Sequence, residues 1–144
     1  MKLTLHDYIS IKIHKTDLKL TSYIKSELER YNLAPEQNLV MMLLWESDGL
    51  TQNQVAEKLN KDKTNIARMS SSLEKKGFIE RINCTNDRRS IKLYLTTIGK
   101  ELKDKVIPIT EGFNDIVSSD MTENELLEFE RLLSKVNKNI EKLL

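Results

Sequence analysis

The segment from residue 49 to residue 99 constrains the fold of this 144-residue chain more than any other. It contains two helical patterns, Gln52–Leu59 and Lys63–Lys76, which only three residues separate. Two stretches of alternating apolar and polar residues follow, Phe78–Asn83 and Ser90–Leu95, and alternation of this kind predicts β-strands. Two helices joined by a tight turn and followed by a two-stranded hairpin predict a winged helix-turn-helix.

Local signals mark the ends of these two helices. Thr51 and Gln54 form a T-x-x-Q capping box, in which each side chain satisfies a backbone amide at the start of the first helix. Asn60 stands where the turn needs a left-handed residue, a conformation that asparagine tolerates. Asp62 is suited to cap the second helix and Gly77 to end it. The segment is therefore locally consistent with the predicted motif.

The rest of the chain predicts four more helices, over residues 3–31, Pro35–Glu46, 97–118 and 122 to the C-terminus. The expected class is mainly α, with the order helix, helix, short extended segment, helix, helix, strand, strand, helix, helix. Pro108 and Gly112 predict a kink in the fifth helix. In the last two helices apolar residues recur at alternating steps of three and four, as in a coiled-coil seam. These residues are Leu102, Val106, Ile109, Phe113 and Ile116, then Leu126, Phe129, Leu133, Val136, Ile140 and Leu143.

Composition limits the class of protein. The chain is 39% apolar and 31% charged, and its longest apolar run, Leu39–Trp45, is too short to span a bilayer. One cysteine, Cys84, and no signal-peptide pattern favour a cytoplasmic protein, in which Cys84 is structural or incidental. His6 and His14 are eight residues apart, which does not predict a helical metal site. We find no phosphate loop, H-E-x-x-H or G-x-S-x-G motif, so we expect neither an enzyme nor a cofactor.

Basic charge is concentrated in one part of the chain. Residues 60–92 carry nine basic and four acidic side chains, whereas residues 93–144 carry seven and ten, although the net charge is only +1. A local basic patch is typical of a surface that faces nucleic-acid phosphates. The alternative is a chance cluster of solvated lysines. The residues that we expect to contact phosphates are Thr51, Gln52, Lys61, Lys75, Lys76 and Lys92.

The second helix of the motif has two distinct faces. At 100° per residue, Ile66, Met69 and Leu73 lie on one side. The opposite side is polar, and arginine and asparagine there can bind guanine and adenine through two hydrogen bonds. The alternative is an ordinary solvated face. The residues that we expect to contact bases in the major groove are Lys63, Thr64, Asn65, Arg68 and Ser71.

The hairpin tip carries a second basic feature. We expect a loop over residues 84–89, in which Arg88 and Arg89 enter the narrow and strongly negative minor groove. Asp87 can hold one of these arginines through a charge-assisted pair. The alternative is that they are merely polar turn residues.

With these residues the chain resembles the MarR family of bacterial transcriptional regulators, the multiple-antibiotic-resistance type. The resemblance rests on Leu50–Leu59, on the block from Arg68 to Arg81, on the D-x-R wing Asp87–Arg89, and on Leu95–Gly99. It covers the whole chain, because the flanking helices also match the layout of the family. By position, Thr64, Asn65 and Arg68 correspond to residues that face the groove in the family, and Arg89 to the arginine of the wing.

The resemblance implies a homodimer on palindromic double-stranded DNA, in which residues 35–99 bind DNA and residues 1–34 and 100–144 form the dimer. It also implies a repressor that a small aromatic or lipophilic effector releases from DNA. One candidate effector pocket comprises Tyr8, Tyr23, Met41, Met42 and Trp45, although such residues are also typical of a plain core. The rival function is a winged-helix module that binds protein without specific DNA binding.

Overall fold

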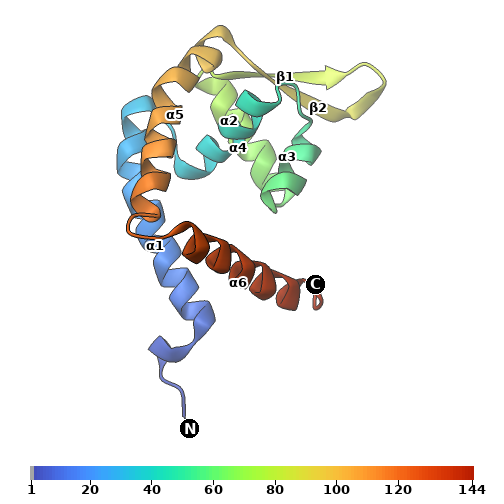
Figure 1. Ribbon diagram of the computed structural model, residues 1–144. Helices are drawn as coiled ribbons and strands as arrows, with labels where there is room; N and C mark the ends of the chain where they lie inside the picture. The colour runs from blue at the N-terminus through green and yellow to red at the C-terminus, as the bar shows by residue number, and fades with distance from the viewer. Residues whose placement is uncertain (1) are drawn as a thin grey trace. The chain divides into compact units, whose positions relative to one another are not determined.

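The computed structural model describes residues 2–144, with the side chains of residues 87–89 excepted. The chain forms two compact units, which divide between Ile109 and Thr110. Its elements follow the predicted order of a mainly α winged helix (Figure 1). They are a 3₁₀ turn at Leu5–Asp7, α1 at Ile9–Leu28, a 3₁₀ turn at Glu29–Tyr31, α2 at Pro35–Glu46, α3 at Gln52–Leu59, α4 at Lys63–Lys75, β1 at Ile79–Cys84, β2 at Asp87–Leu95, α5 at Thr97–Val117 and α6 at Glu123–Glu141.

The core of the first unit forms around α2. This helix is apolar on nearly every side, and Val40, Met41 and Leu44 are almost completely buried. Burial on several sides is expected of a helix that has no polar face to present to water. The other core residues come from elements on both sides of α2 in the sequence, which makes the winged helix one packed unit. They include Leu28, Leu33, Val55, Ile66, Leu73, Ile79, Leu93, Leu102 and Val106.

The predicted helix ends are confirmed. The Thr51 hydroxyl accepts from the backbone N–H of Gln54 at 3.1 Å, and the Gln54 side chain accepts from that of Thr51 at 2.9 Å. Asn60 adopts the left-handed conformation at φ +53°, and the Asp62 carboxylate caps α4. Gly77 follows α4 at φ +83°, a region that an L side chain rarely enters. Short-range chemistry therefore sets the length of both helices of the motif.

The hairpin differs from the prediction at its tip. The turn contains only Thr85 and Asn86, and β2 begins at Asp87 instead of Ser90. Alternation of apolar residues marks only the stretch of a hairpin that lies on a core, whereas backbone pairing continues beyond it. The side chains of Asp87, Arg88 and Arg89 lie outside the described residues, so their predicted role in the minor groove stays a prediction.

An isolated β-bridge joins the segment before α3 to the wing. The backbone of Thr51 forms a bridge with that of Lys92. Next to it, the N–H of Gly49 donates to the carbonyl of Leu93 at 3.0 Å, and the N–H of Leu93 donates to the carbonyl of Leu50 at 2.8 Å. These bonds tie the segment before α3 to the hairpin. They confirm the extended segment predicted between the second and third helices.

The start of α5 is locked to the end of α4. The Thr96 N–H donates to the carbonyl of Phe78 at 3.1 Å, and its hydroxyl donates to the carbonyl of Gly77 at 2.6 Å. The Gly99 N–H donates to the same Thr96 hydroxyl at 3.1 Å, while the Gly99 carbonyl accepts from the indole N–H of Trp45 at 2.9 Å. The Phe78 carbonyl oxygen lies so close to Gly99 that a Cβ at this position would be 2.0 Å from it, which requires a residue without a side chain.

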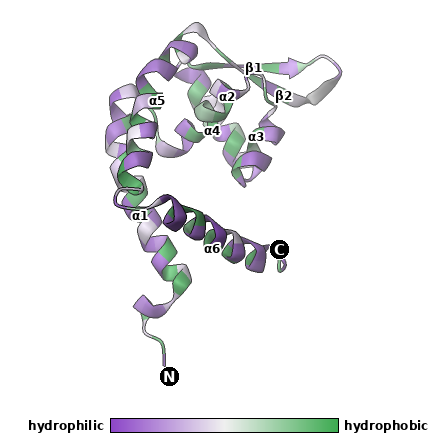
Figure 2. Ribbon diagram, viewed as in Figure 1, coloured by the Kyte–Doolittle hydropathy of each residue, from purple (hydrophilic) through white to green (hydrophobic). Residues whose placement is uncertain are grey.

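The second unit consists of the end of α5 and α6. The predicted capping box is present, with the Thr122 hydroxyl accepting from the Glu125 N–H at 3.1 Å. Along α6, polar and apolar residues follow one another in short stretches (Figure 2). None of the residues of α6 is buried. The helix α5 continues through Pro108 to Val117, and the predicted kink stays a prediction. None of the described helices is long and apolar enough to cross a membrane.

We expect Gly99→Ala to destabilise the fold, because the added Cβ would lie 2.0 Å from the Phe78 carbonyl oxygen. Such overpacking lowers the free energy of unfolding by about 1–3 kcal/mol. Gly112→Ala is the matched control in the same helix, since a Cβ there meets no described atom within 4 Å. That change should raise stability by about 0.5–1 kcal/mol. Urea titration of both variants measures the effect, and equal stabilities would contradict the packing of the α4–α5 junction.

Candidate nucleic-acid interface

The helix α4 has the two faces expected from its sequence. Ile66 and Leu73 are completely buried, and Met69 is 7% exposed. Lys63, Thr64, Arg68 and Lys75 are exposed, and Asn65 and Ser71 are partly buried. Burial of the apolar face sets the rotation of the helix about its own axis. It therefore leaves the predicted base-contacting residues on the open side.

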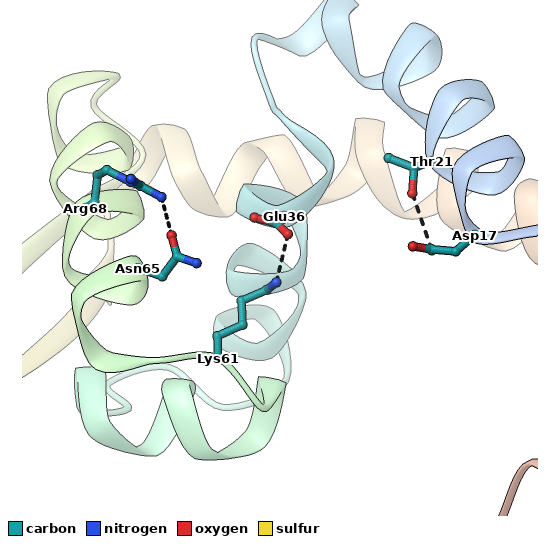
Figure 3. A network of polar contacts seen from close by, with 6 residues as sticks. All are labelled: Asp17, Thr21, Glu36, Lys61, Asn65 and Arg68. Carbon is teal, nitrogen blue, oxygen red and sulfur yellow. Dashed lines mark hydrogen bonds and ion pairs between the residues drawn. The ribbon is translucent and has the colours of Figure 1, made fainter. Parts of the chain in front are cut away.

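Two of these residues, Asn65 and Arg68, are hydrogen-bonded to each other. The guanidinium of Arg68 donates through Nη2 to the side-chain oxygen of Asn65, one turn earlier in α4 (Figure 3). A bidentate contact with adenine needs both that oxygen and the amide N–H of asparagine. While the pair is formed, one lone pair of the Asn65 oxygen is occupied, and the remaining N–H groups of Asn65 and Arg68 are donors. The arrangement suits base edges that carry acceptors, as guanine does at O6 and N7.

The predicted phosphate contacts divide into two groups. Lys75 on α4 and Lys92 on β2 are exposed, so their ammonium groups are accessible from solvent. Thr51 and Gln52 begin α3, where Thr51 also caps the helix. Lys61 and Lys76 differ, because each has a partner within the chain. The structure therefore gives the six predicted residues different surroundings, and their contact with phosphates stays a prediction.

The partners of Lys61 and Lys76 lie in and just before α2. The ammonium of Lys61 is 2.8 Å from the Glu36 carboxylate (Figure 3). Lys76 donates to the Asn32 carbonyl and to the Gln37 side-chain oxygen, both at 2.7 Å. Burial lowers the pKa of Lys76 below its ordinary value. Sequence reasoning missed these pairs because their members lie at least 25 residues apart.

A further ion pair joins α4 to β1. The Glu74 carboxylate accepts from the backbone N–H of Arg81 at 2.8 Å and from its Nε at 3.2 Å. The backbone hydrogen bond is the main reason that the pKa of Glu74 lies below its ordinary value of 4.5. The side-chain bond and the positive charge of Arg81 lower it further, against the effect of burial. This pair sets the position of the hairpin relative to the end of α4.

The predicted effector pocket is divided between two helices. Met41 is completely buried in the core, Met42 is partly buried, and the Trp45 indole is bonded to Gly99. Tyr8 precedes α1 and is 47% exposed, whereas Tyr23 lies inside α1 and is 43% exposed. Fifteen residues of a largely helical segment separate these two tyrosines by roughly 22 Å. The chain therefore does not bring Tyr8 and Tyr23 together.

Metal-ligating side chains do not gather among the described residues. Within residues 2–86 and 90–144, no group of three or more His, Cys, Asp or Glu side chains is placed to hold a metal ion. His6 instead lies 2.8 Å from the ammonium of Lys15 through its Nδ1. Cys84 is partly buried at the end of β1.

Known proteins share both the sequence pattern and the fold. Residues 33–91 match the MarR family model. The chain is 29% identical over 107 residues to the organic hydroperoxide resistance transcriptional regulator of Bacillus subtilis, covering 74% of this chain and 73% of that protein. A Listeria monocytogenes protein complexed with 26mer DNA is 28% identical, with a TM-score of 0.80 over 97% of this chain and 90% of that one.

A second structural neighbour supports the fold alone. The S. aureus MepR–DNA complex has a TM-score of 0.87 but is only 24% identical, and the match covers 92% of this chain and 98% of that one. Similarity of this kind extends over both units of the chain. It shows that helices and strands in this order occur in a known fold.

We expect Glu74→Gln to weaken the fold near neutral pH by about 1 kcal/mol or less, since exposed ion pairs contribute little. The folded pKa lies below the unfolded one, so the carboxylate stabilises the fold above pH 4.5. That contribution is lost as the pH falls through the folded pKa. The difference between wild type and variant should therefore shrink in acid, as urea titrations at several pH values measure. Glu80→Gln, an exposed glutamate on β1, is the control. A difference independent of pH would contradict the assignment.

Proposed function

The chain belongs to the MarR family, and from that premise we propose that it is a homodimeric, sequence-specific DNA-binding transcription regulator. We propose further that it acts as a repressor and that a small aromatic or lipophilic molecule releases it from DNA. The proposal rests on the orientation of α4, because its apolar face is buried and its polar and cationic face is open. The similarity to a structure complexed with DNA supports the same reading.

In this proposal α4 enters the major groove. The N-terminal part of the second helix of a helix-turn-helix meets the base edges, which assigns base contacts to Lys63, Thr64, Asn65 and Arg68. Ser71 lies one turn further along the same side. Since Asn65 already accepts a hydrogen bond from Arg68, we assign the main contact to Arg68 and a supporting role to Asn65.

Phosphate contacts supply the affinity. Lys75 and Lys92 are exposed cations on α4 and β2, and Thr51 and Gln52 lie at the start of α3. Each phosphate that a cation neutralises releases counterions, so binding weakens as salt rises. The wing residues Asp87–Arg89 are assigned to the minor groove from their sequence alone. Two-fold symmetry of the dimer requires two half-sites in inverted orientation, and we expect them about one helical turn apart.

A second copy of the chain is the proposed partner of the apolar residues on α6. Although α6 is amphipathic, Phe129, Leu133, Val136 and Ile140 are 38–53% exposed. Exposed apolar rows of this kind mark protein–protein contacts. The effector is proposed from family membership, with the response placed in α5 at Pro108, where the helix lacks one backbone N–H. The proposed dimer regions are residues 1–34 and 100–144.

The rival function is a winged-helix module that binds protein without specific DNA binding. A gel shift with the region upstream of its own gene distinguishes the two functions. The proposal predicts a shift that excess random DNA does not compete away at moderate salt. No specific shift, with or without reductant, would favour the rival.

We expect Arg68→Ala to lower the affinity for the specific site by about 1–3 kcal/mol and to relax base preference at one position in each half-site. Asn65→Ala should cost less, and in the double variant the two effects should be less than additive, because Asn65 acts through Arg68. Fluorescence anisotropy with single-base variants of the site measures both. Lys100→Ala, an exposed cation on α5, is the control for loss of charge. Unchanged base preference in Arg68→Ala would contradict the assignment of this face.

We expect Leu133→Asp or Ile140→Asp to give a monomer that loses binding to a palindromic site, because a buried carboxylate in an apolar contact is strongly unfavourable. Lys138→Asp is the control, since Lys138 lies on the side of α6 opposite Phe129 and Ile140. Sedimentation velocity at micromolar concentration measures the mass in solution. If the Leu133 and Ile140 variants both remained dimers, the assignment of α6 to the dimer contact would be wrong.

A further inference from the structure

Two adjacent lysines at the end of α4 have different surroundings. Lys75 is exposed, whereas Lys76 is partly buried and follows the last residue of the helix. The ammonium of Lys76 donates to the Asn32 carbonyl and to Gln37 Oε1, both at 2.7 Å. Its charge is thus directed at acceptors within the chain. Two of the three N–H donors of the ammonium are therefore engaged within the chain.

Gln37 is the centre of this polar contact. Its Oε1 accepts from Lys76 and also from the backbone N–H of Ala34 at 3.2 Å. Its Nε2 donates to the Ser72 hydroxyl at 3.1 Å. Ser72 and Lys76 are four residues apart, which places them on the same side of α4. One glutamine in the first turn of α2 therefore holds two successive turns at the end of α4.

The neighbouring residue of α2 holds the other end of α4. Glu36 pairs with Lys61 at 2.8 Å, and Lys61 lies two residues before the first residue of α4 (Figure 3). The Lys61 side chain is 20% exposed, although lysine is usually a solvated residue. The first turn of α2 thus contacts the chain just before α4 and just after it. Two such contacts resist a tilt of α4 that a single contact would permit.

We propose that Lys61 and Lys76 are positioning residues, which hold α4 at both ends against Glu36 and Gln37 of α2 and do not neutralise DNA phosphates. The inference rests on the proposed function and changes the role expected for these two lysines from their sequence. Asn32 adds a structural consequence. It adopts the left-handed conformation at φ +57° where the turn after α1 ends, so Lys76 also ties α4 to the junction of α1 and α2.

The test compares Lys76→Met with Lys75→Met, two variants that lose the same charge at adjacent positions. Binding is measured by fluorescence anisotropy over a range of KCl concentrations. The probes are the duplex that the wild-type protein enriches most from a random pool, and a random duplex of equal length. For Lys75→Met we expect the slope of log K against log salt to fall by about two, roughly one for each protomer of the dimer, with an unchanged ratio of specific to random binding.

For Lys76→Met we expect an unchanged salt slope, a loss of roughly tenfold in specific affinity, and unchanged binding to the random duplex. A tenfold loss is about 1.4 kcal/mol. If Lys76→Met lowered the salt slope as Lys75→Met does and weakened binding to both duplexes equally, Lys76 would be a phosphate contact. That result would overturn this inference and leave the proposed function intact. A wild-type chain that binds neither duplex would overturn the proposed function and this inference with it.

For Glu36→Gln, a phosphate contact and a positioning role of Lys61 predict opposite changes in DNA affinity. If Lys61 were a phosphate contact, removing its acidic partner would free the ammonium and strengthen binding to both duplexes. A positioning role predicts weaker specific binding, because α4 loses one of its two fixed ends. Gln37→Ala removes no charge and should reproduce the effect of Lys76→Met. Stronger binding by Glu36→Gln, or unchanged specificity in Gln37→Ala when circular dichroism shows an intact fold, would overturn the inference.

Discussion

Burial of one face of α4 is the interaction on which the functional surface depends. Ile66 and Leu73 are completely buried, and full burial of such side chains stabilises a fold by about 1.5–3 kcal/mol each. Turning the helix about its axis would expose them and bury Arg68 instead. The core therefore decides which residues of α4 face outward. Lys63, Thr64, Arg68 and Lys75 are exposed on this open face and are accessible to a ligand.

Polar contacts restrict the tilt of α4, whereas burial of its apolar face sets its rotation. Hydrophobic burial is not directional, so it leaves the tilt and register of a helix less defined than its rotation. Bonds from Lys61, Ser72 and Lys76 to the first turn of α2 restrict the tilt of α4. The pair of Glu74 and Arg81 restricts the hairpin. Each contact is weak alone, and together they connect the two DNA-facing elements of the proposal to one core helix.

Sequence reasoning succeeded where the determinants are local. The capping residues Thr51, Asp62 and Thr122 and the apolar spacing of α4 define helix ends and faces within one or two turns of the chain. It placed the start of β2 three residues too late, because the spacing of apolar residues does not reveal the backbone pairing of Asp87. It also missed the partners of Lys61 and Lys76, since a lysine near the end of a helix looks the same whether it faces solvent or a neighbouring helix.

In the proposed function, a dimer of this chain binds a specific DNA sequence. The direct measurement is to sequence the DNA that the purified protein retains from a random pool, at a stated salt concentration. We expect enrichment of a palindrome whose two half-sites lie about one helical turn apart, with guanine at the position that faces Arg68. Retained DNA with the base composition of the starting pool would contradict it.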